Sequence, residues 1–357
     1  MTGIWAGIDA GKGHHHCVAL DAQGGKLLSR RIANDEPELL KLIADVLALG
    51  EDVTWAIDLA DGGAALVIAL LVGHGQRVLY IPGRTVNRAS AGYRGEGKTD
   101  ARDAVVIADQ ARMRRDLMPV NVADDDLTEL RLTTRRRTDL VCDRTRAVNR
   151  LRGMLTSLFP ALERTLDLSN NGPLVLLTGY QTPAGIRRMG ASRLETWLRN
   201  RKVRGCASLA RLAVDAAERQ HTAVPGEKAT ARMVHTLARE VMDLNEKIAE
   251  ADAAIQAAFQ AQPHAEIVTS MPGIGPLLGA EFLAATGGDM ALFASPDRLA
   301  TYAGLAPAPR DSGKISGNRH RPTRYHRGLQ RVFYMSAMSS LTCCPDSRRY
   351  YGRFQVQ

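Results

Sequence analysis

Aromatic side chains are scarce in this chain of 357 residues, because Phe, Tyr and Trp together make up only 5% of it. Alanine and leucine are plentiful instead, and this combination favours a structure rich in helix. The chain is long enough for two or three domains, each with its own core.

Cysteine and long apolar runs are also lacking. The five cysteines are scattered and none has the C-x-x-C spacing, so neither a zinc site nor a disulfide framework is supported. We therefore expect a reducing, cytoplasmic compartment. No apolar run reaches the roughly 18 residues that a membrane span needs. The N-terminal stretch MTGIWAGIDAGKG is typical of a first strand and not of a signal peptide.

Positive charge is in excess, since 47 Lys and Arg residues stand against 38 Asp and Glu residues, for a net charge of +9. Such a balance suits a polyanionic partner such as nucleic acid. It carries no information about the fold.

Residues 1–118 predict an α/β domain. Three β-rich runs come first, at Ile4–Ala10, His16–Leu20 and Lys26–Ile32. Helical and strand patterns then alternate, with helices at Pro37–Leu49 and Ala64–Val72 and strands at Val53–Asp58 and Arg77–Ile81. Three adjacent strands followed by alternating helices and strands are the order of the ribonuclease H-like fold.

The stretch Tyr93–Arg112 predicts a Gly-rich loop followed by a capped helix. Thr99 is a natural N-cap, and apolar residues recur after it at helical spacing. Asp100 and Asp103 stand three apart, so both carboxylates project from one face near the first turn, where acids are favoured. By itself, this stretch is an ordinary helix start.

Two further acids change that interpretation. In the ribonuclease H-like fold, an acid on the first strand, an acid at the end of the fourth and carboxylates on the last helix converge. Asp9, Asp58, Asp100 and Asp103 occupy those places. Mg²⁺ prefers hard oxygen ligands, and two such ions about 4 Å apart can activate an attacking oxygen and stabilise a leaving one at a phosphodiester. We therefore expect a magnesium site, with Mn²⁺ as a substitute. Asp61 is a rival for the second position, but Asp58 is preferred because it ends an apolar strand.

Sugar kinases and actin-like ATPases share this core and offer an alternative. Their phosphate loops contain a D-x-G-x pattern, which Gly7–Lys12 and Asp58–Gly63 can match. Against this alternative, the chain has no convincing adenosine-site motif, and the acidic helix has no role in it.

Three consecutive histidines, His14, His15 and His16, resemble metal ligands. Because neighbouring residues on a strand point to alternate faces, a shared site is not expected. We interpret them as structural or substrate-facing.

Residues 119–260 predict two long helices with heptad repeats. The first repeats at Leu127, Thr134, Val141, Val148 and Leu155, and the second at Val234, Val241, Ile248 and Ile255. We expect them to form an antiparallel coiled-coil stalk, within one subunit or between two. An insert around residues 165–225 separates them, and the segment after Pro160 is expected to be irregular. The first helix is skewed to arginine, which favours a phosphate-backbone role.

Residues 261–345 predict a mainly helical third domain, and a tail follows at residues 346–357. The turn Pro272–Gly275 resembles a helix-hairpin-helix, whose glycines let backbone N–H groups approach a phosphate. Ser312, in Asp-Ser-Gly-Lys, is a candidate nucleophile if the arginines around it hold a phosphate and stabilise the developing charge. Ser316 is the fallback.

The residues expected to contact nucleic acid are spread along the whole chain, and most of them are arginines suited to phosphates. They are Lys98, Arg135, Arg136, Arg137, Arg144, Gly273, Gly275, Arg310, Lys314, Arg319, Arg321 and Arg324.

Taken in order, these motifs resemble a known family. Asp9 in GIDAGK, an acid before Gly-Gly, KTD-x-x-D, PGIGP, YAGLAP and a late Ser-Gly are together similar to the DEDD transposases of the insertion-sequence 110 family. The resemblance covers nearly the whole chain. It implies a RuvC-like N-terminal domain, a coiled-coil segment and a C-terminal transposase domain with a catalytic serine. The chain departs from the family at the second acid, where Asp58 stands in place of the usual Glu.

The resemblance also implies a mechanism. Asp9, Asp58, Asp100 and Asp103 would be the metal-binding tetrad, and Ser312 would attack a DNA phosphodiester to form a phosphoserine link. Members of the family are recombinases guided by a bridge RNA encoded in the mobile element. The implied partners are therefore donor and target DNA, that RNA, and further copies of this chain in a dimer or tetramer acting at the bacterial nucleoid. A metal-only structure-specific nuclease and a non-catalytic nucleic-acid scaffold are the alternatives.

Overall fold

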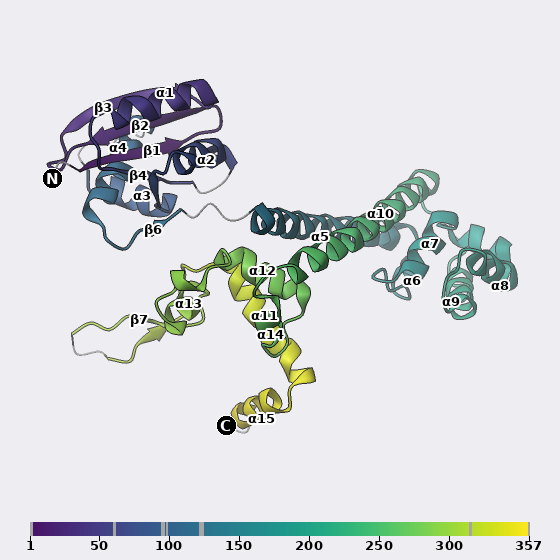
Figure 1. The fold of residues 1–357 in the computed structure, drawn as a ribbon. Helices are drawn as coiled ribbons and strands as arrows, with labels where there is room; N and C mark the ends of the chain where they lie inside the picture. The colour runs from purple at the N-terminus through teal and green to yellow at the C-terminus, as the bar shows by residue number, and fades with distance from the viewer. Residues whose placement is uncertain are drawn as a thin grey trace. The chain divides into compact units, whose positions relative to one another are not determined.

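The computed structural model describes residues 3–59, 62–93, 97, 99–120, 125–313 and 316–355. The chain divides into two compact units, Met1–Asp124 and Asp125–Gln357 (Figure 1). The first is a mixed α/β unit and the second is almost entirely helical, as the composition predicts.

A six-stranded sheet forms the middle layer of the first unit, with strand order β3-β2-β1-β4-β5-β6. The strands are β1 (Ile4–Ala10), β2 (His14–Leu20), β3 (Lys26–Ala33), β4 (Val53–Ile57), β5 (Arg77–Tyr80) and β6 (Met118–Pro119). The first three pair antiparallel, β4 lies parallel to β1 and β5 parallel to β4, and the short β6 pairs antiparallel with β5. This order fits the ribonuclease H-like fold, and the predicted mixed α/β class is confirmed.

Helices cover both faces of this sheet (Figure 1). They are α1 (Glu36–Leu47), α2 (Ala65–Gly73) after the short 3₁₀ turn η1 (Gly62–Ala64), α3 (Gly83–Ser90) and α4 (Asp100–Met113). Alternate residues of each strand point to opposite faces. Ile8 and Ile57 therefore pack with α1 and α2, whereas Ala56 and Val18 pack with α4. The sequence patterns did not predict helix α3, the short strand β6 or the turn η1.

Strand β1 and helix α4 approach each other very closely at Gly7. A Cβ atom added there would lie 2.3 Å from the backbone nitrogen of Ala108 and 2.4 Å from the carbonyl oxygen of Ala104. Only glycine fits, so Gly7 sets the distance at which α4 lies on the sheet.

Two helices of 34 residues each, α5 (Asp125–Leu158) and α10 (Glu227–Gln260), lie side by side in the second unit (Figure 1). Arg137 forms an ion pair with Asp252, and Arg144 donates to the Asn245 side chain at 3.5 Å. A step of seven residues toward the C-terminus of α5 thus matches a step of seven residues toward the N-terminus of α10. The two helices are therefore antiparallel, and both belong to one chain.

The buried face of α5 is wider than one heptad seam. The predicted positions Leu127, Thr134 and Leu155 are buried, but so are Leu140 and Ala147, which the heptad pattern leaves out. The reason is that α5 also packs on the insert, whose core it shares with α10.

The insert was expected to be irregular after Pro160, and that expectation was wrong. It contains α6 (Pro160–Glu163), α7 (Asn171–Gly179), α8 (Pro183–Arg199) and α9 (Cys206–Glu218). Pro173 lies in the first turn of α7, where proline is tolerated. Leu and Ala residues of α7 and α9 are buried in a core shared with the two long helices, and this burial stabilises the helices.

The remainder of the second unit consists of short helices and one small hairpin. The elements are α11 (Ala265–Thr269), α12 (Pro276–Thr286), η2 (Met290–Leu292), α13 (Pro296–Tyr302), β7 (Ala308–Pro309), β8 (Arg319–His320), α14 (Arg327–Cys343) and α15 (Pro345–Gln355).

All five cysteines are free thiols, and burial raises the pKa of Cys17 to about 12. Within the described part of the chain, no helix is both long and apolar enough to cross a bilayer.

Replacing Gly7 by valine is expected to destabilise the first unit by at least about 2 kcal/mol, since the side chain has no space and the backbone must separate. Urea unfolding followed by hydrogen exchange of β1 and α4 amides measures this loss. Gly13→Ala is the matched control, because an added Cβ meets nothing within 4 Å there. Equal protection in the Gly7 variant and the wild type would contradict the packing argument.

Truncation of Arg137 to alanine should lower the free energy of unfolding of the α5/α10 pair by about 1–3 kcal/mol, because Asp252 loses its partner in a half-buried position. The exchanged pair Arg137→Asp with Asp252→Arg should recover part of this loss. Arg136→Ala, at an exposed position of the same helix, should change stability by less than about 0.5 kcal/mol. Hydrogen exchange in α10 reports all three.

Candidate active site

Asp9 and Asp58 come to the same edge and the same face of the sheet. In the parallel pair of β1 and β4, Gly7 lies beside Ala56 and Ile8 beside Ile57. Asp9 is two residues beyond Gly7 and Asp58 two beyond Ala56, so the strand alternation directs both toward the α4 side. The backbone N–H of Ala10 donates to Asp58 Oδ1 at 3.2 Å, which fixes that carboxylate at the end of β1.

The first turn of α4 adds Asp100 and Asp103 to this edge. Burial raises the pKa of Asp58, and the negative charge of Asp103 raises it further, although the Ala10 N–H bond opposes both effects. Asp103 is therefore close enough to Asp58 to repel it. Among the described residues, however, no three side chains of the His, Cys, Asp or Glu type are arranged to hold a metal ion. The carboxylates gather at one edge without forming a closed ligand set.

His16, which the sequence left open between a structural and a substrate-facing role, joins the acidic edge. It lies opposite Asp9 in the β1–β2 pair, so the two side chains share a face. Burial lowers the pKa of His16, while the charge of Asp100 raises it. Its Nε2 lies 3.0 Å from Ser29 Oγ. The signal that would have found it is the tight turn after β1, which determines the register between Asp9 and β2.

His15 points to the opposite face and is 1% exposed, so the prediction of alternate faces is confirmed. Burial lowers its pKa, and the neighbouring Asn34 side chain works in the other direction. The Asn34 amide donates to the carbonyl oxygens of Lys12 at 3.3 Å and Gly63 at 3.0 Å. It thereby ties the β1–β2 turn to the segment that follows Asp58.

Arg102 holds the loop that precedes α4. The helix is capped by Thr99, whose Oγ1 accepts from the Arg102 N–H at 3.2 Å. The Arg102 guanidinium donates to the carbonyl oxygens of Gly97, Ser90 and Tyr93 at 2.8, 3.0 and 3.0 Å. The arginine between the two aspartates of the motif is thus a structural clamp. Lys98, Asp61 and Lys314, which the sequence analysis singled out, lie outside the described residues.

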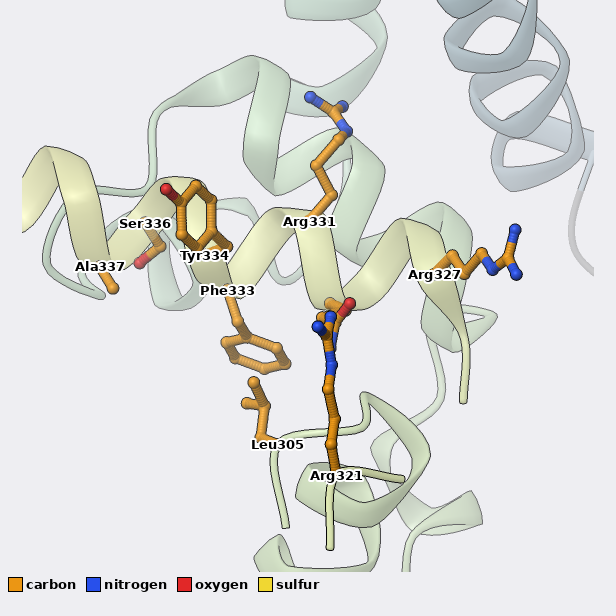
Figure 2. A pocket seen from close by; sticks show the side chains of 9 residues that line it. Leu305, Arg321, Arg327, Arg331, Phe333, Tyr334, Ser336 and Ala337 are labelled. Atoms are coloured by element: carbon orange, nitrogen blue, oxygen red, sulfur yellow. The ribbon is translucent and has the colours of Figure 1, made fainter. Parts of the chain in front are cut away.

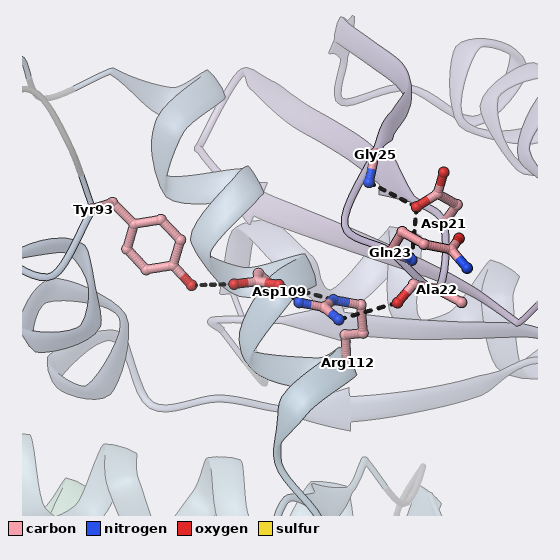
Figure 3. Close-up of polar contacts among 7 residues, drawn as sticks. All are labelled: Asp21, Ala22, Gln23, Gly25, Tyr93, Asp109 and Arg112. Carbon is pink, nitrogen blue, oxygen red and sulfur yellow. Dashed lines mark hydrogen bonds and ion pairs between the residues drawn. The ribbon is translucent and has the colours of Figure 1, made fainter.

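A second network fixes the far end of α4 (Figure 3). Asp109 accepts from the Tyr93 hydroxyl at 2.6 Å and from two Arg112 nitrogens at 2.9 and 2.6 Å. Arg112 also donates to the Ala22 carbonyl oxygen at 3.1 Å. Asp21 closes the same turn through bonds from the Gln23 and Gly25 N–H groups. These contacts orient α4 and with it Asp100 and Asp103.

The predicted arginines of α5 divide into two kinds. Arg137 and Arg144 are half-buried and bond to α10, so they hold the helix pair together. Arg135 and Arg136 are exposed. Exposure leaves the second two on a surface that a nucleic-acid backbone can reach.

The two glycines of the Pro272–Gly275 turn also differ in role. A Cβ on Gly273, whose φ is +77°, would lie 2.2 Å from the carbonyl oxygen of Ser336 and 2.7 Å from the nitrogen of Ser340. Gly273 is therefore required by the packing of this turn on α14. Around Gly275, an added Cβ would meet nothing within 4 Å, so this position is open.

Ser312 lies on an exposed hairpin. Strands β7 and β8 pair at Ala308–His320 and Pro309–Arg319, and the Arg310 N–H donates to the Asn318 carbonyl oxygen at 2.8 Å. Asp311 Oδ1 accepts from the Asn318 N–H at 3.0 Å, and Ser312 is the next residue along the chain. Ser312 and Ser316 are both exposed, as are the four arginines expected near them: Arg310, Arg319, Arg321 and Arg324.

The strand order of the sheet and the acidic residues at its edge define an α/β protein with a ribonuclease H-like domain. Residues 6–160 match a family model described as Transposase, and residues 265–352 match one described as Transposase IS116/IS110/IS902 family. The chain belongs to the insertion-sequence 110 family of transposases, so the family predicted from the motifs is confirmed.

Proteins of several insertion elements are similar along nearly their whole length. An uncharacterized 42 kDa protein of insertion element IS900 from Mycobacterium paratuberculosis is 56% identical, over 99% of this chain and 90% of that protein. A 44.8 kDa protein of IS116 from Streptomyces clavuligerus is 52% identical, over 98% and 87%. A 43.6 kDa protein of IS110 from Streptomyces coelicolor is 35% identical, over 99% and 87%.

Asp58→Asn should make the metal-free protein more stable at pH 7. Because the pKa of Asp58 is raised in the folded state, the folded protein retains this proton to higher pH than the unfolded chain. The stability that the protonated Asp58 carboxyl contributes is therefore fully present below its ordinary pKa of 3.8, and it is lost as the pH rises through the pKa in the folded state. Asparagine keeps the oxygen that accepts from Ala10 and removes the charge.

Thermal unfolding between pH 4 and 8 in EDTA measures this difference, which should shrink as the pH falls. Glu51→Gln, an exposed carboxylate removed in the same unit, should show no such trend. A variant that is less stable than the wild type at pH 7 would show that the carboxylate stabilises the fold.

Proposed function

We propose that this transposase breaks and rejoins DNA strands through a phosphoserine link at Ser312, assisted by Mg²⁺ at an acidic tetrad of Asp9, Asp58, Asp100 and Asp103. The observation that carries the proposal is geometric: Asp9 and Asp58 lie at the ends of two adjacent parallel strands, and the Ala10 N–H holds the Asp58 carboxylate at that edge. Burial and the neighbouring Asp103 also raise the pKa of Asp58. A site that is unfavourable for its own negative charge gains most from a divalent cation.

The four carboxylates have distinct tasks in this proposal. Asp9 and Asp58 end adjacent strands, so their separation is determined by the sheet. Asp100 and Asp103 belong to a capped helix that Arg102 and Asp109 hold in place. A bound Mg²⁺, or Mn²⁺ in its place, supplies Lewis-acid stabilisation of negative charge on phosphodiester oxygens.

Ser312 is the proposed nucleophile. Its Oγ forms a bond to phosphorus as a phosphorus–oxygen bond to the deoxyribose breaks; the serine gives up its proton and the released sugar oxygen takes one up. The exposed guanidinium groups of Arg310, Arg319, Arg321 and Arg324 offset the charge that develops on the phosphate. The link conserves the phosphodiester energy, so the strand can be rejoined by the reverse attack of a second sugar hydroxyl.

The remaining parts bind and assemble the substrates. We propose that α5 and α10 form a coiled coil, that residues 1–118, 119–260 and 261–345 act as the three domains, and that a dimer or tetramer holds the two duplexes. Arg135, Arg136, Lys98 and Lys314 contact nucleic-acid backbones, and Gly275 leaves backbone N–H groups open to a phosphate. A bridge RNA selects the sites by base pairing, in the cytoplasm at the nucleoid.

A metal-dependent, structure-specific endonuclease is the second candidate. It is favoured by the fact that the acidic edge and Ser312 belong to different compact units, so hydrolysis at the acids needs no part of the second unit. In that case Ser312 takes no part in the chemistry.

Substitution of the proposed groups separates the candidates. On a DNA substrate supplied with the element's RNA and Mg²⁺, Ser312→Ala should abolish covalent protein–DNA adducts and lower recombination by at least about 10³-fold. Asp103→Asn should cause a similar loss in recombination. Ser316→Ala is the matched control and should keep most of the activity.

Hydrolytic cleavage that survives in the Ser312 variant would favour the nuclease. Adducts that disappear only in the Ser316 variant would move the nucleophile to that residue. Inertness of the wild-type protein with every metal and RNA tried would favour a non-catalytic scaffold.

A further inference from the structure

A pocket of about 740 Å³ lies along α14 in the second unit (Figure 2). One wall is α14 itself, and the other includes Leu305 and Arg321. Arg321 directly follows β8, so one side of the pocket is formed where the hairpin that carries Ser312 ends. Its volume falls within the range of sites for small ligands and single nucleotides.

The positive charge of the pocket is largely uncompensated. Arg321, Arg327 and Arg331 line it, and no acidic residue is among the lining side chains. Of the ion pairs within the described parts of the chain, one reaches the pocket: Arg331 bonds to Glu281 of α12. Three guanidinium groups with one carboxylate favour an anionic occupant, and guanidinium is the side-chain group best matched to phosphate.

The pocket also offers flat apolar surface. Tyr334 is 61% exposed and Leu305 49% exposed, so both present apolar surface at the pocket. Phe333 is held edge-to-face on Phe282, with ring centroids 6.0 Å apart. An exposed tyrosine ring beside arginines is the surface on which an unstacked base packs.

The walls are held in place by contacts at the start of α14. His326 caps α14 by accepting from the Leu329 N–H at 3.0 Å, and its ring stacks on Tyr302 at 5.4 Å. The Gln330 side chain donates to the Gly304 carbonyl oxygen at 3.5 Å. These contacts join the start of α14 to the segment that bears Leu305, so the pocket is formed before any ligand binds.

We infer that this pocket receives one unstacked nucleotide of the nucleic-acid substrate, with its base on Tyr334 and its phosphate between Arg321 and Arg327. The inference rests on the proposed function only in requiring a nucleic-acid partner. A fully paired duplex keeps its bases stacked and can offer only phosphates. The occupant is therefore a nucleotide from a single strand, a bulge or an opened junction, in DNA or in RNA.

Binding of the full-length protein to four labelled probes of equal length tests this inference: single-stranded DNA, single-stranded RNA, blunt duplex DNA and the same duplex with one unpaired nucleotide. Arg321→Ala and Tyr334→Ala should each weaken binding of the unpaired and single-stranded probes by about tenfold. Tyr334→Ala should change binding of the blunt duplex by less than about twofold. Arg353→Ala and Tyr351→Ala, which replace exposed residues of α15, are the matched controls.

Photocrosslinking gives a readout that a folding defect does not imitate. Probes with 5-iodouracil at the unpaired position should crosslink to Tyr334, which mass spectrometry of the α14 peptide identifies. Tyr334→Phe should retain the crosslink and Tyr334→Ala should lose it. A stronger crosslink in the RNA or the DNA arm identifies the source of the nucleotide, and either supports the pocket.

The inference would be overturned if the α15 control variants lost as much binding of the unpaired and single-stranded probes as the pocket variants. It would also be overturned if both pocket variants bound the bulged probe as tightly as the wild type. This outcome differs from failure of the proposed recombination. A crosslink through Tyr334 without an adduct at Ser312 would support the pocket and contradict the proposed serine mechanism. Adducts at Ser312 without a Tyr334 crosslink would support the serine mechanism and contradict the pocket.

Discussion

The contact between strand β1 and helix α4 determines how the acidic residues of the first unit come together. At Gly7 the helix backbone lies so close that any side chain would collide with Ala104 and Ala108. Because the helix is this close, its first turn lies over the end of the strand that carries Asp9. Arg102 at one end of α4 donates to the carbonyl oxygens of Ser90 and Tyr93 just before the helix, and Arg112 at the other end donates to that of Ala22, far away in the sequence. Helix position, and not only residue identity, brings Asp103 near Asp58.

The acidic edge is a local conflict within an otherwise well-packed unit. Burial and the neighbouring Asp103 both disfavour the charged form of Asp58, and one backbone N–H offsets part of this. Such a conflict is typical of a functional site, because groups placed for chemistry are seldom placed for stability. His16 lies on the same face through its pairing with Asp9, so the edge combines carboxylates with an imidazole.

The second unit uses its many arginines in two ways. Some stabilise the fold, as Arg137 does by pairing with Asp252 and as Arg187 does by donating to carbonyl oxygens at the end of α9. Others, including Arg136, Arg310 and Arg321, remain exposed. A net positive composition therefore overstates the charge that is available to a partner. The exposed arginines of α5, around the Ser312 hairpin and along α14 are the part that can meet a phosphate backbone.

The sequence by itself determined the α/β class of the first unit, the positions of its main strands, the two long helices and the family. These follow from patterns of nearby residues: alternation in strands, helical spacing, a Thr99 cap, and motifs in a fixed order. The sequence did not determine helix α3, the helical insert after Pro160 or the packing of Gly273 on α14. These features depend on burial against other segments of the chain. The close approach at Gly7, the register of His16 with Asp9 and the clamp made by Arg102 were decided by the tertiary structure alone. The contact at Gly7 joins segments about 100 residues apart, and its energy depends on the packing of both, so it leaves no local pattern in the sequence. The pairing of His16 with Asp9 and the bonds of Arg102 span at most 12 residues, but they depend on the exact path of a turn and a loop, which residue patterns do not specify.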